Sequence, residues 1–146
     1  MTLVENGNLW ADIRSPAMRK TRRGLFLDRD GTLIELVDYL ADPGKVTLLT
    51  DTVSEVRRAN SAGIAVVIVT NQSGIGRGLY QWADFEAVQA RVIELLLEAG
   101  AKIDAVYACP HPPPDAGGPL VSAYRKPAPG MLMRASRDLG LDLATS

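Results

Sequence analysis

Residues 64–70 read IAVVIVT, a continuous run of apolar and β-branched side chains that ends in a threonine. Such runs are typical of parallel strands that are buried on both faces of a sheet. A glycine-rich stretch, NQSGIGRGL, follows directly at 71–79, as expected for a loop that leaves the carboxyl end of a strand. This part of the sequence therefore predicts a central strand of an α/β domain.

The flanking sequence alternates between strand and helix patterns. Short apolar runs predict two more strands, and apolar positions at helical spacing followed by glycine predict helices; these segments are 24–27 and 102–109, then 52–63, 82–100 and 129–140. This alternation is typical of an α/β domain with a mainly parallel sheet flanked by helices. We expect a core over 24–146, preceded by a polar lead segment at 1–23 in which Trp10 and Ile13 can pack.

Composition narrows the class of protein. The 146 residues carry a net charge of −1, which gives no general reason to expect a nucleic acid or a membrane as partner. The single cysteine excludes an internal disulfide and agrees with a reducing compartment. No signal peptide and no apolar run of about 20 residues is visible. We expect a cytoplasmic protein that is a monomer.

Two aspartates stand at the end of the first expected strand, in FLDRDGTL at 26–33. In extended backbone Asp28 and Asp30 point to the same side, and Gly31 allows a sharp turn after them. Two carboxylates that lie so near each other repel, and they therefore favour a bound cation or a shared proton. With Mg²⁺, one can attack phosphorus while the other transfers protons. The alternative from these residues alone is an ordinary turn after a strand.

Two other segments carry polar groups at expected strand or helix ends. Thr70 is followed by the amides of 71–73, and a hydroxyl beside a row of N–H groups can hold phosphate oxygens. Lys126, in YRKPAPGM at 124–131, stands just before a helix and can neutralise a phosphoryl group. Taken singly, the first segment is also typical of a plain turn, and a lysine is most often a surface residue.

In this order, DRDGTL, VIVTN and RKPAPGM resemble the first three motifs of the haloacid dehalogenase (HAD) superfamily of phosphatases and phosphotransferases. The resemblance implies a Rossmann-like fold in which Asp28 is the nucleophile and Asp30 the general acid and base. It also implies that Mg²⁺ lies on the Asp28 carboxylate and the Asp30 backbone carbonyl. Thr70, Asn71 and Lys126 would bind the phosphoryl group.

Within the superfamily, FLDRDGTL, VVIVTNQSGIGRG, YACPHPP and RKPAPGM are similar to the subfamily of heptose 1,7-bisphosphate phosphatases and histidinol-phosphatases. This implies a small phosphorylated sugar as substrate and a core without a large cap domain. Gln72 and Ser73 would then lie near the substrate. Arg77 and Arg125 are candidates for binding sugar hydroxyls or a second phosphate, since arginine binds anions with two donors. Either arginine can equally be a surface residue.

The chain departs from the subfamily pattern at a structural zinc site. The subfamily resemblance implies a Cys-x-His pair and a later Cys-x-Cys pair as ligands. Here Cys109 and His111 are present, but Ser122 and Tyr124 stand where the second pair is expected. Two ligands do not complete a tetrahedral site. We therefore predict no zinc.

A second departure concerns the fourth motif, a strand that ends in metal-binding aspartates in the superfamily. It is expected after GLDLATS at 140–146, and Asp138 and Asp142 do not replace it because neither follows an apolar strand. A metal ligand and a sheet strand are thus missing from these residues, which predicts weaker Mg²⁺ binding. Whether these 146 residues alone are active stays open.

Three other functions compete with a heptose bisphosphate phosphatase. One is a histidinol-phosphatase, and a second is a polynucleotide 3′-phosphatase, which would need a basic channel for its substrate. The third is a catalytically weak or inactive phosphate-binding module. The intact pair Asp28 and Asp30 argues against a pure binding role.

Overall fold

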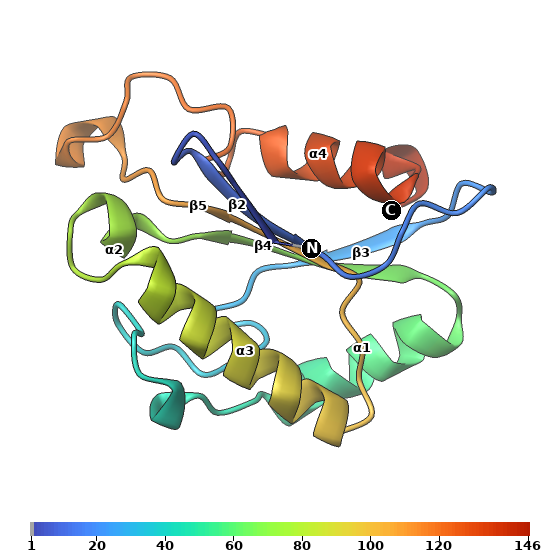
Figure 1. The fold of residues 1–146 in the computed structure, drawn as a ribbon. Helices are drawn as coiled ribbons and strands as arrows, with labels where there is room; N and C mark the ends of the chain where they lie inside the picture. Colours follow the sequence, from blue (N-terminus) through green and yellow to red (C-terminus); the bar gives the residue numbers. More distant parts are fainter. Residues whose placement is uncertain (1) are drawn as a thin grey trace.

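The computed structural model describes residues 2–146. One five-stranded sheet has the order β1-β2-β5-β4-β3 (Figure 1). Three of its strands are parallel, namely β3 (Gly24–Leu27), β4 (Ala65–Asn71) and β5 (Ala105–Cys109). They confirm the strands predicted at 24–27, 64–70 and 102–109. The mixed, mostly parallel sheet confirms the predicted α/β class.

Helices cover both faces of the sheet (Figure 1). On one face lie α1 (Thr50–Ser61) and α3 (Trp82–Glu98), and on the other lies α4 (Gly130–Leu139). The one-turn helix α2 (Ser73–Gly76) leaves the end of β4, and three short 3-10 helices are η1 (Pro43–Lys45), η2 (Pro114–Ala116) and η3 (Leu143–Thr145). The three long helices confirm the predicted segments. None of the helices within residues 2–146 is long and apolar enough to cross a bilayer.

The continuous apolar run of β4 follows from its position between two cores. Val66 and Ile68 pack into the core under α1 and α3, whereas Val67 and Val69 pack into the core under α4. Alternate side chains of a strand point to opposite faces, so a strand covered on both faces needs apolar residues at every position. The pattern that predicted this strand thus has a direct physical cause.

The N-terminal segment is part of the sheet. β1 (Thr2–Glu5) and β2 (Leu9–Ile13) form an antiparallel hairpin, and β2 pairs antiparallel with β5. The sequence predicted only a polar lead here, in which Trp10 could pack; Trp10 does pack in the core, with its ring centroid 4.9 Å from that of Phe85. Asn6 and Gly7 both have positive φ, and the Asn8 N–H donates to the Glu5 carbonyl at 2.8 Å, so they form the centre of an Asn-Gly turn of the kind common in hairpins.

At the opposite side of the sheet, β3 is the outer strand. Leu141 forms a parallel bridge with Arg22, and the backbone N–H of Gly24 donates to the Ser146 hydroxyl at 2.9 Å. An open groove of about 990 Å³ lies between β3 and α1. No strand of the described residues follows β5 in the chain, so the strand expected for the fourth motif is not among them.

Candidate active site

The predicted site residues meet at the carboxyl ends of the parallel strands. Asp28 follows β3, and Thr70 and Asn71 end β4, opposite Ala108 and Cys109 of β5 in the sheet register. Open α/β sheets bind their ligands at this edge. The fold therefore brings side chains that are far apart in sequence to one place.

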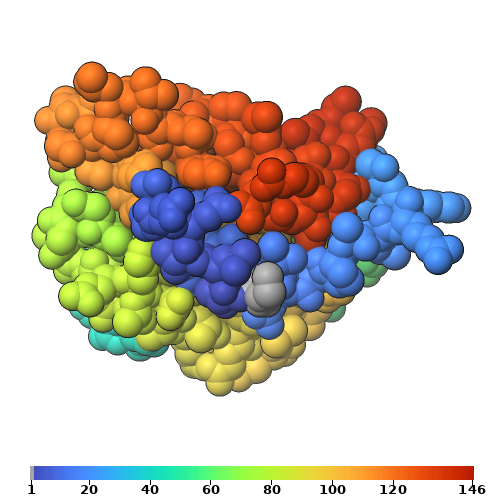
Figure 2. Space-filling view, turned by 45° about the horizontal axis from the view of Figure 1, so that its top comes forward, coloured from blue at the N-terminus to red at the C-terminus, as the bar shows by residue number. Residues whose placement is uncertain are grey.

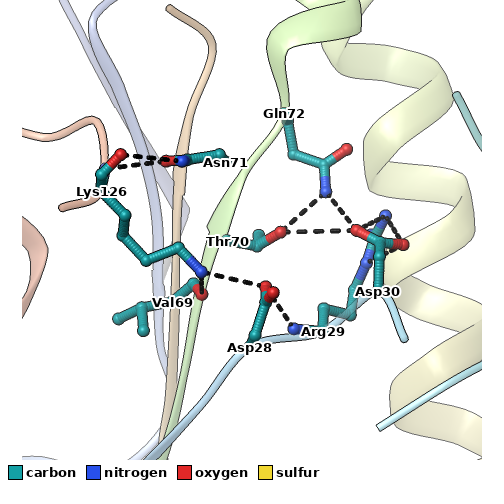
Figure 3. A network of polar contacts seen from close by, with 8 residues as sticks. All are labelled: Asp28, Arg29, Asp30, Val69, Thr70, Asn71, Gln72 and Lys126. Carbon is teal, nitrogen blue, oxygen red and sulfur yellow. Dashed lines mark hydrogen bonds and ion pairs between the residues drawn. The ribbon is translucent and has the colours of Figure 1, made fainter. Parts of the chain in front are cut away.

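Asp28 pairs with Lys126 (Figure 3). The Lys126 Nζ lies 3.1 Å from Asp28 Oδ1 and also donates to the backbone carbonyl of Val69 at 3.0 Å. The backbone N–H of Arg29 donates to the same Oδ1 at 2.8 Å. The Asp28 side chain is still 44% exposed, so the carboxylate is both oriented and accessible.

The side chain of Asn71 holds the backbone of Lys126. Its Oδ1 accepts from the Lys126 N–H at 3.0 Å, and its Nδ2 donates to the Lys126 carbonyl at 3.3 Å. This two-way contact couples the end of β4 to the segment before α4. Asn71 is thus a positioning residue for Lys126, and its expected contact with phosphate stays a prediction.

Asp30 accepts hydrogen bonds from three other residues (Figure 3). Arg29 Nη2 lies 3.1 and 3.3 Å from its two carboxylate oxygens, and Gln72 Nε2 donates to Oδ2 at 2.8 Å. The Thr70 hydroxyl lies 3.5 Å from the same oxygen and 2.9 Å from Gln72 Nε2. Every recorded partner of this carboxylate is a donor, so the network holds it as an acceptor.

Arg29 is the main residue of the site that sequence reasoning missed. Its side chain is only 1% exposed, and its guanidinium lies 5.1 Å from the centre of the Phe85 ring. Gln89 Oε1 accepts from its Nη1 at 3.4 Å. An arginine after a strand is normally solvated, and only the position of α3 against β3 shows that this one is buried. A buried guanidinium needs such partners because removing a charge from water is costly.

Tyr80 also belongs to this network, through its contact with Gln72. Its hydroxyl donates to Gln72 Oε1, which turns the Gln72 amide so that its nitrogen faces Asp30 and Thr70. Burial raises the pKa of Tyr80 to about 12. The hydroxyl therefore stays a neutral donor at ordinary pH.

A cavity of about 370 Å³ opens next to Asp30. It is lined by the flap segment 36–40, by 71–74 at the end of β4, and by Asp30 and Tyr80. Tyr39, at the tip of the flap, has a φ of 48° and is 49% exposed. The larger groove beside α1 contains none of the polar site residues. The smaller cavity is therefore the one that adjoins the polar network, through Asp30, Asn71 and Gln72.

The other predicted residues lie around this centre. Ser73 lines the cavity, whereas Arg77 ends α2 as an exposed residue and takes no part in the network of Figure 3. The Arg125 guanidinium donates to the His111 carbonyl at 2.9 Å, next in sequence to Lys126. Roles for these residues in substrate binding stay predictions.

Hydrogen bonds link the residues that stand at the positions of the subfamily zinc site. Ser122 Oγ lies 2.7 Å from His111 Nδ1 and 3.9 Å from Cys109 Sγ. Burial raises the pKa of the Cys109 thiol, which disfavours the thiolate that zinc binds. Within residues 2–146, no three histidine, cysteine or acidic side chains are grouped to hold a metal ion.

Asp138 and Asp142 have structural contacts. Asp138 Oδ2 accepts from the Tyr107 hydroxyl at 2.8 Å and from Arg134 Nε at 2.9 Å. Asp142 caps η3 through the N–H of Ala144. Both carboxylates are therefore engaged away from Asp28.

The chain matches a known protein family and is similar in sequence to proteins named as phosphatases. A family model described as polynucleotide kinase 3 phosphatase matches residues 17–145, which begin after β2. The D-glycero-beta-D-manno-heptose-1,7-bisphosphate 7-phosphatase of Mesorhizobium japonicum is 49% identical over 126 residues, 84% of this chain and 57% of the relative. The protein of the same name from Pseudomonas aeruginosa is 37% identical over 125 residues, 85% of this chain and 67% of the relative.

Two solved structures share the fold. A candidate HAD-like phosphatase from Mesorhizobium loti superimposes with a TM-score of 0.88 at 44% identity, over 97% of this chain and 68% of that one. The D,D-heptose 1,7-bisphosphate phosphatase of B. bronchiseptica, complexed with magnesium and phosphate, gives a TM-score of 0.69 at 34% identity, over 79% of this chain and 62% of that one. The chain thus belongs to the polynucleotide kinase 3 phosphatase family, a group of HAD-like phosphatases. It spans about three fifths of the length of the M. japonicum relative.

Proposed function

We propose that the chain forms the catalytic part of a Mg²⁺-dependent phosphatase that hydrolyses a small phosphorylated sugar, of the heptose 1,7-bisphosphate type, through an aspartyl phosphate. The observation that carries the proposal is the pairing of Asp28 with Lys126 beside Thr70 at the strand ends. The names of the relatives support the sugar bisphosphate as substrate. We further propose a cytoplasmic monomer that acts without nucleic acid, membrane or zinc.

In the first step Asp28 attacks phosphorus. All recorded contacts of its carboxylate involve Oδ1, which leaves Oδ2 to form the new P–O bond while the bond to the leaving oxygen breaks. The Lys126 ammonium and the Thr70 hydroxyl stand beside the reacting group, where they can stabilise the phosphoryl oxygens. Asp30, when protonated, gives its proton to the leaving oxygen.

In the second step water attacks the phosphorus of the aspartyl phosphate, the P–O bond to Asp28 breaks, and inorganic phosphate leaves. Asp30, now a carboxylate surrounded by donors from Arg29, Gln72 and Thr70, accepts the proton of that water. This regenerates Asp28 and the protonated form of Asp30.

The oxygens at the strand end are compatible with magnesium. The Asp28 carboxylate and the Asp30 backbone carbonyl would hold Mg²⁺, an ion that commonly combines one or two carboxylates with water and substrate phosphate. When bound, Mg²⁺ supplies neutralisation of the charge on the phosphoryl group. The solved structure of the B. bronchiseptica phosphatase, complexed with magnesium and phosphate, supports magnesium as the ion.

The test is phosphate release by the chain with and without Mg²⁺. The substrates are heptose 1,7-bisphosphate, histidinol phosphate and an oligonucleotide with a 3′-phosphate. We expect release from the heptose compound, and Asp28→Asn should reduce it by about three orders of magnitude or more, since the nucleophile is lost. Preference for the oligonucleotide or for histidinol phosphate would move the assignment to that branch. Release that Asp28→Asn leaves unchanged would refute the aspartyl-phosphate mechanism.

A further inference from the structure

The segment that carries Lys126 has little regular structure of its own. Between β5 and α4, residues 110–129 contain one short 3-10 helix, η2. Leu120 and Val121 in this segment are 91% and 87% exposed. Asn71 holds the backbone of Lys126 at one end, but a loop of this length needs further attachments to keep one conformation.

The N-terminal hairpin supplies such attachments (Figure 2, where residues 2–13 lie against the loop and α4). Both Glu5 carboxylate oxygens accept from Arg134 Nη1 at 2.9 Å, and one also accepts from the Tyr124 hydroxyl at 3.3 Å. Asn8 Oδ1 lies 3.0 Å from His111 Nε2. One turn of the hairpin therefore contacts the loop near both of its ends and contacts α4 as well.

From Asn8 a continuous chain of hydrogen bonds leads to the residue before Lys126. His111 Nδ1 lies 2.7 Å from Ser122 Oγ, and the backbone N–H of Arg125 donates to that Oγ at 3.1 Å. With the imidazole proton on Nε2, the Ser122 hydroxyl donates to Nδ1 and Nε2 donates to Asn8, so each group has one consistent role. The Arg125 guanidinium closes the ring by donating to the His111 carbonyl.

We propose that the β1–β2 hairpin, through Glu5 and Asn8, is a positioning element that holds the 110–126 loop so that Lys126 meets Asp28. The hairpin is itself anchored, because β2 pairs with β5 over four residues from Trp10 to Ile13. The turn of the hairpin is thus an anchored support for the 110–126 loop, which has little regular structure of its own. The consequence for catalysis rests on the proposed function, whereas the attachment of the loop does not.

The test compares the double variant Glu5→Ala/Asn8→Ala with the wild-type chain. Glu94→Gln is the matched control, since it removes another exposed ion pair, with Arg91 on α3. Hydrogen exchange should accelerate by about tenfold or more at the amides of 122–126 and stay unchanged in β4 and α3, because the two replaced side chains bind the loop and α4. Asn8→Asp alone keeps an acceptor for His111 and should behave as wild type.

The kinetic readout separates positioning from general stability. A displaced Lys126 should lower kcat by about ten- to hundredfold, with Mg²⁺-dependent binding of inorganic phosphate also weakened. Unchanged exchange at 122–126 would overturn the proposal, and so would faster exchange spread evenly over β4 and α3. If the wild-type chain releases no phosphate from any substrate, the proposed function fails, but the exchange experiment still decides whether the hairpin holds the loop.

Discussion

At the scale of single residues, the site depends on groups that orient one another. Lys126 is positioned by Asn71, and Gln72 by Tyr80. Neither Asn71 nor Tyr80 needs to touch a substrate to affect the reaction. The role of Tyr80 is the easier of the two to test, because its hydroxyl ionises and its effect on stability can be measured as a function of pH.

We predict that Tyr80 stabilises the fold in a pH-dependent way. Burial raises its pKa to about 12 from its ordinary value of 10. Because the folded-state pKa lies above that of the unfolded chain, the stabilisation is complete below pH 10 and is lost as pH rises from 10 to 12. It amounts to at most about 2–3 kcal/mol. Urea unfolding from pH 9 to 12 should show the stability difference between wild type and Tyr80→Phe shrinking across this window. A difference that stays constant with pH would contradict the prediction.

Most, but not all, residues of the candidate site could be predicted from the sequence. Asp28, Thr70 and Lys126 were predicted because each follows or precedes a recognisable strand or helix, and the structure brings them together. Arg29 was missed, although it adjoins both aspartates. The sequence does not reveal that α3 covers this arginine, and burial is what converts it from a surface residue into part of the site.

At the scale of elements, the turn from β4 into α2 is packed tightly against the flap. A Cβ on Gly74 would lie 2.2 Å from the Tyr80 ring and 2.9 Å from that of Tyr39. Real contacts of this kind do not occur, so one or both rings would have to move. Gly74 is therefore required for packing in this turn.

We predict that Gly74→Ala destabilises the fold by about 1–3 kcal/mol through overpacking. It should also lower kcat, since a displaced Tyr80 releases Gln72 from its orientation toward Asp30. Thermal unfolding and phosphate release measure the two effects. Gly44→Ala is the control, because the nearest atom there is the Asp42 side chain at 3.2 Å, which can shift in solvent. Equal stability of the two variants would refute the packing argument.

Element prediction succeeded where the pattern is local. β4 and α3 were identified because their side chains repeat with the period of a buried strand and of an amphipathic helix. The β1–β2 hairpin was missed because both strands are short and β1 is mostly exposed. The Asn-Gly pair at its turn was the available signal, and pairing with β5 is a tertiary contact that no local pattern contains.

At the scale of the whole molecule, ligand binding should stabilise the fold by mass action. Mg²⁺ and inorganic phosphate, each at about 100 times its Kd, would each add ~2.7 kcal/mol, which raises Tm by about 5–10 °C per ligand for a domain of this size. Thermal unfolding with each ion alone and with both together tests this. The part of the shift that phosphate adds should vanish in Lys126→Met, which loses the phosphate-binding charge. A full shift in that variant would mean that phosphate binds elsewhere.

The class of fold and the order of the parallel strands along the chain could be predicted from the sequence alone, and so could the two aspartates, the threonine and the lysine. These features are encoded locally, in hydrophobic period and in the residues that end each element. The folded chain was needed to see that Arg29 is buried, that Asn71 and Tyr80 orient their neighbours, and that the hairpin contacts the loop before Lys126. Those properties depend on which elements pack together, because burial and long-range hydrogen bonds exist only between segments that the fold has brought into contact.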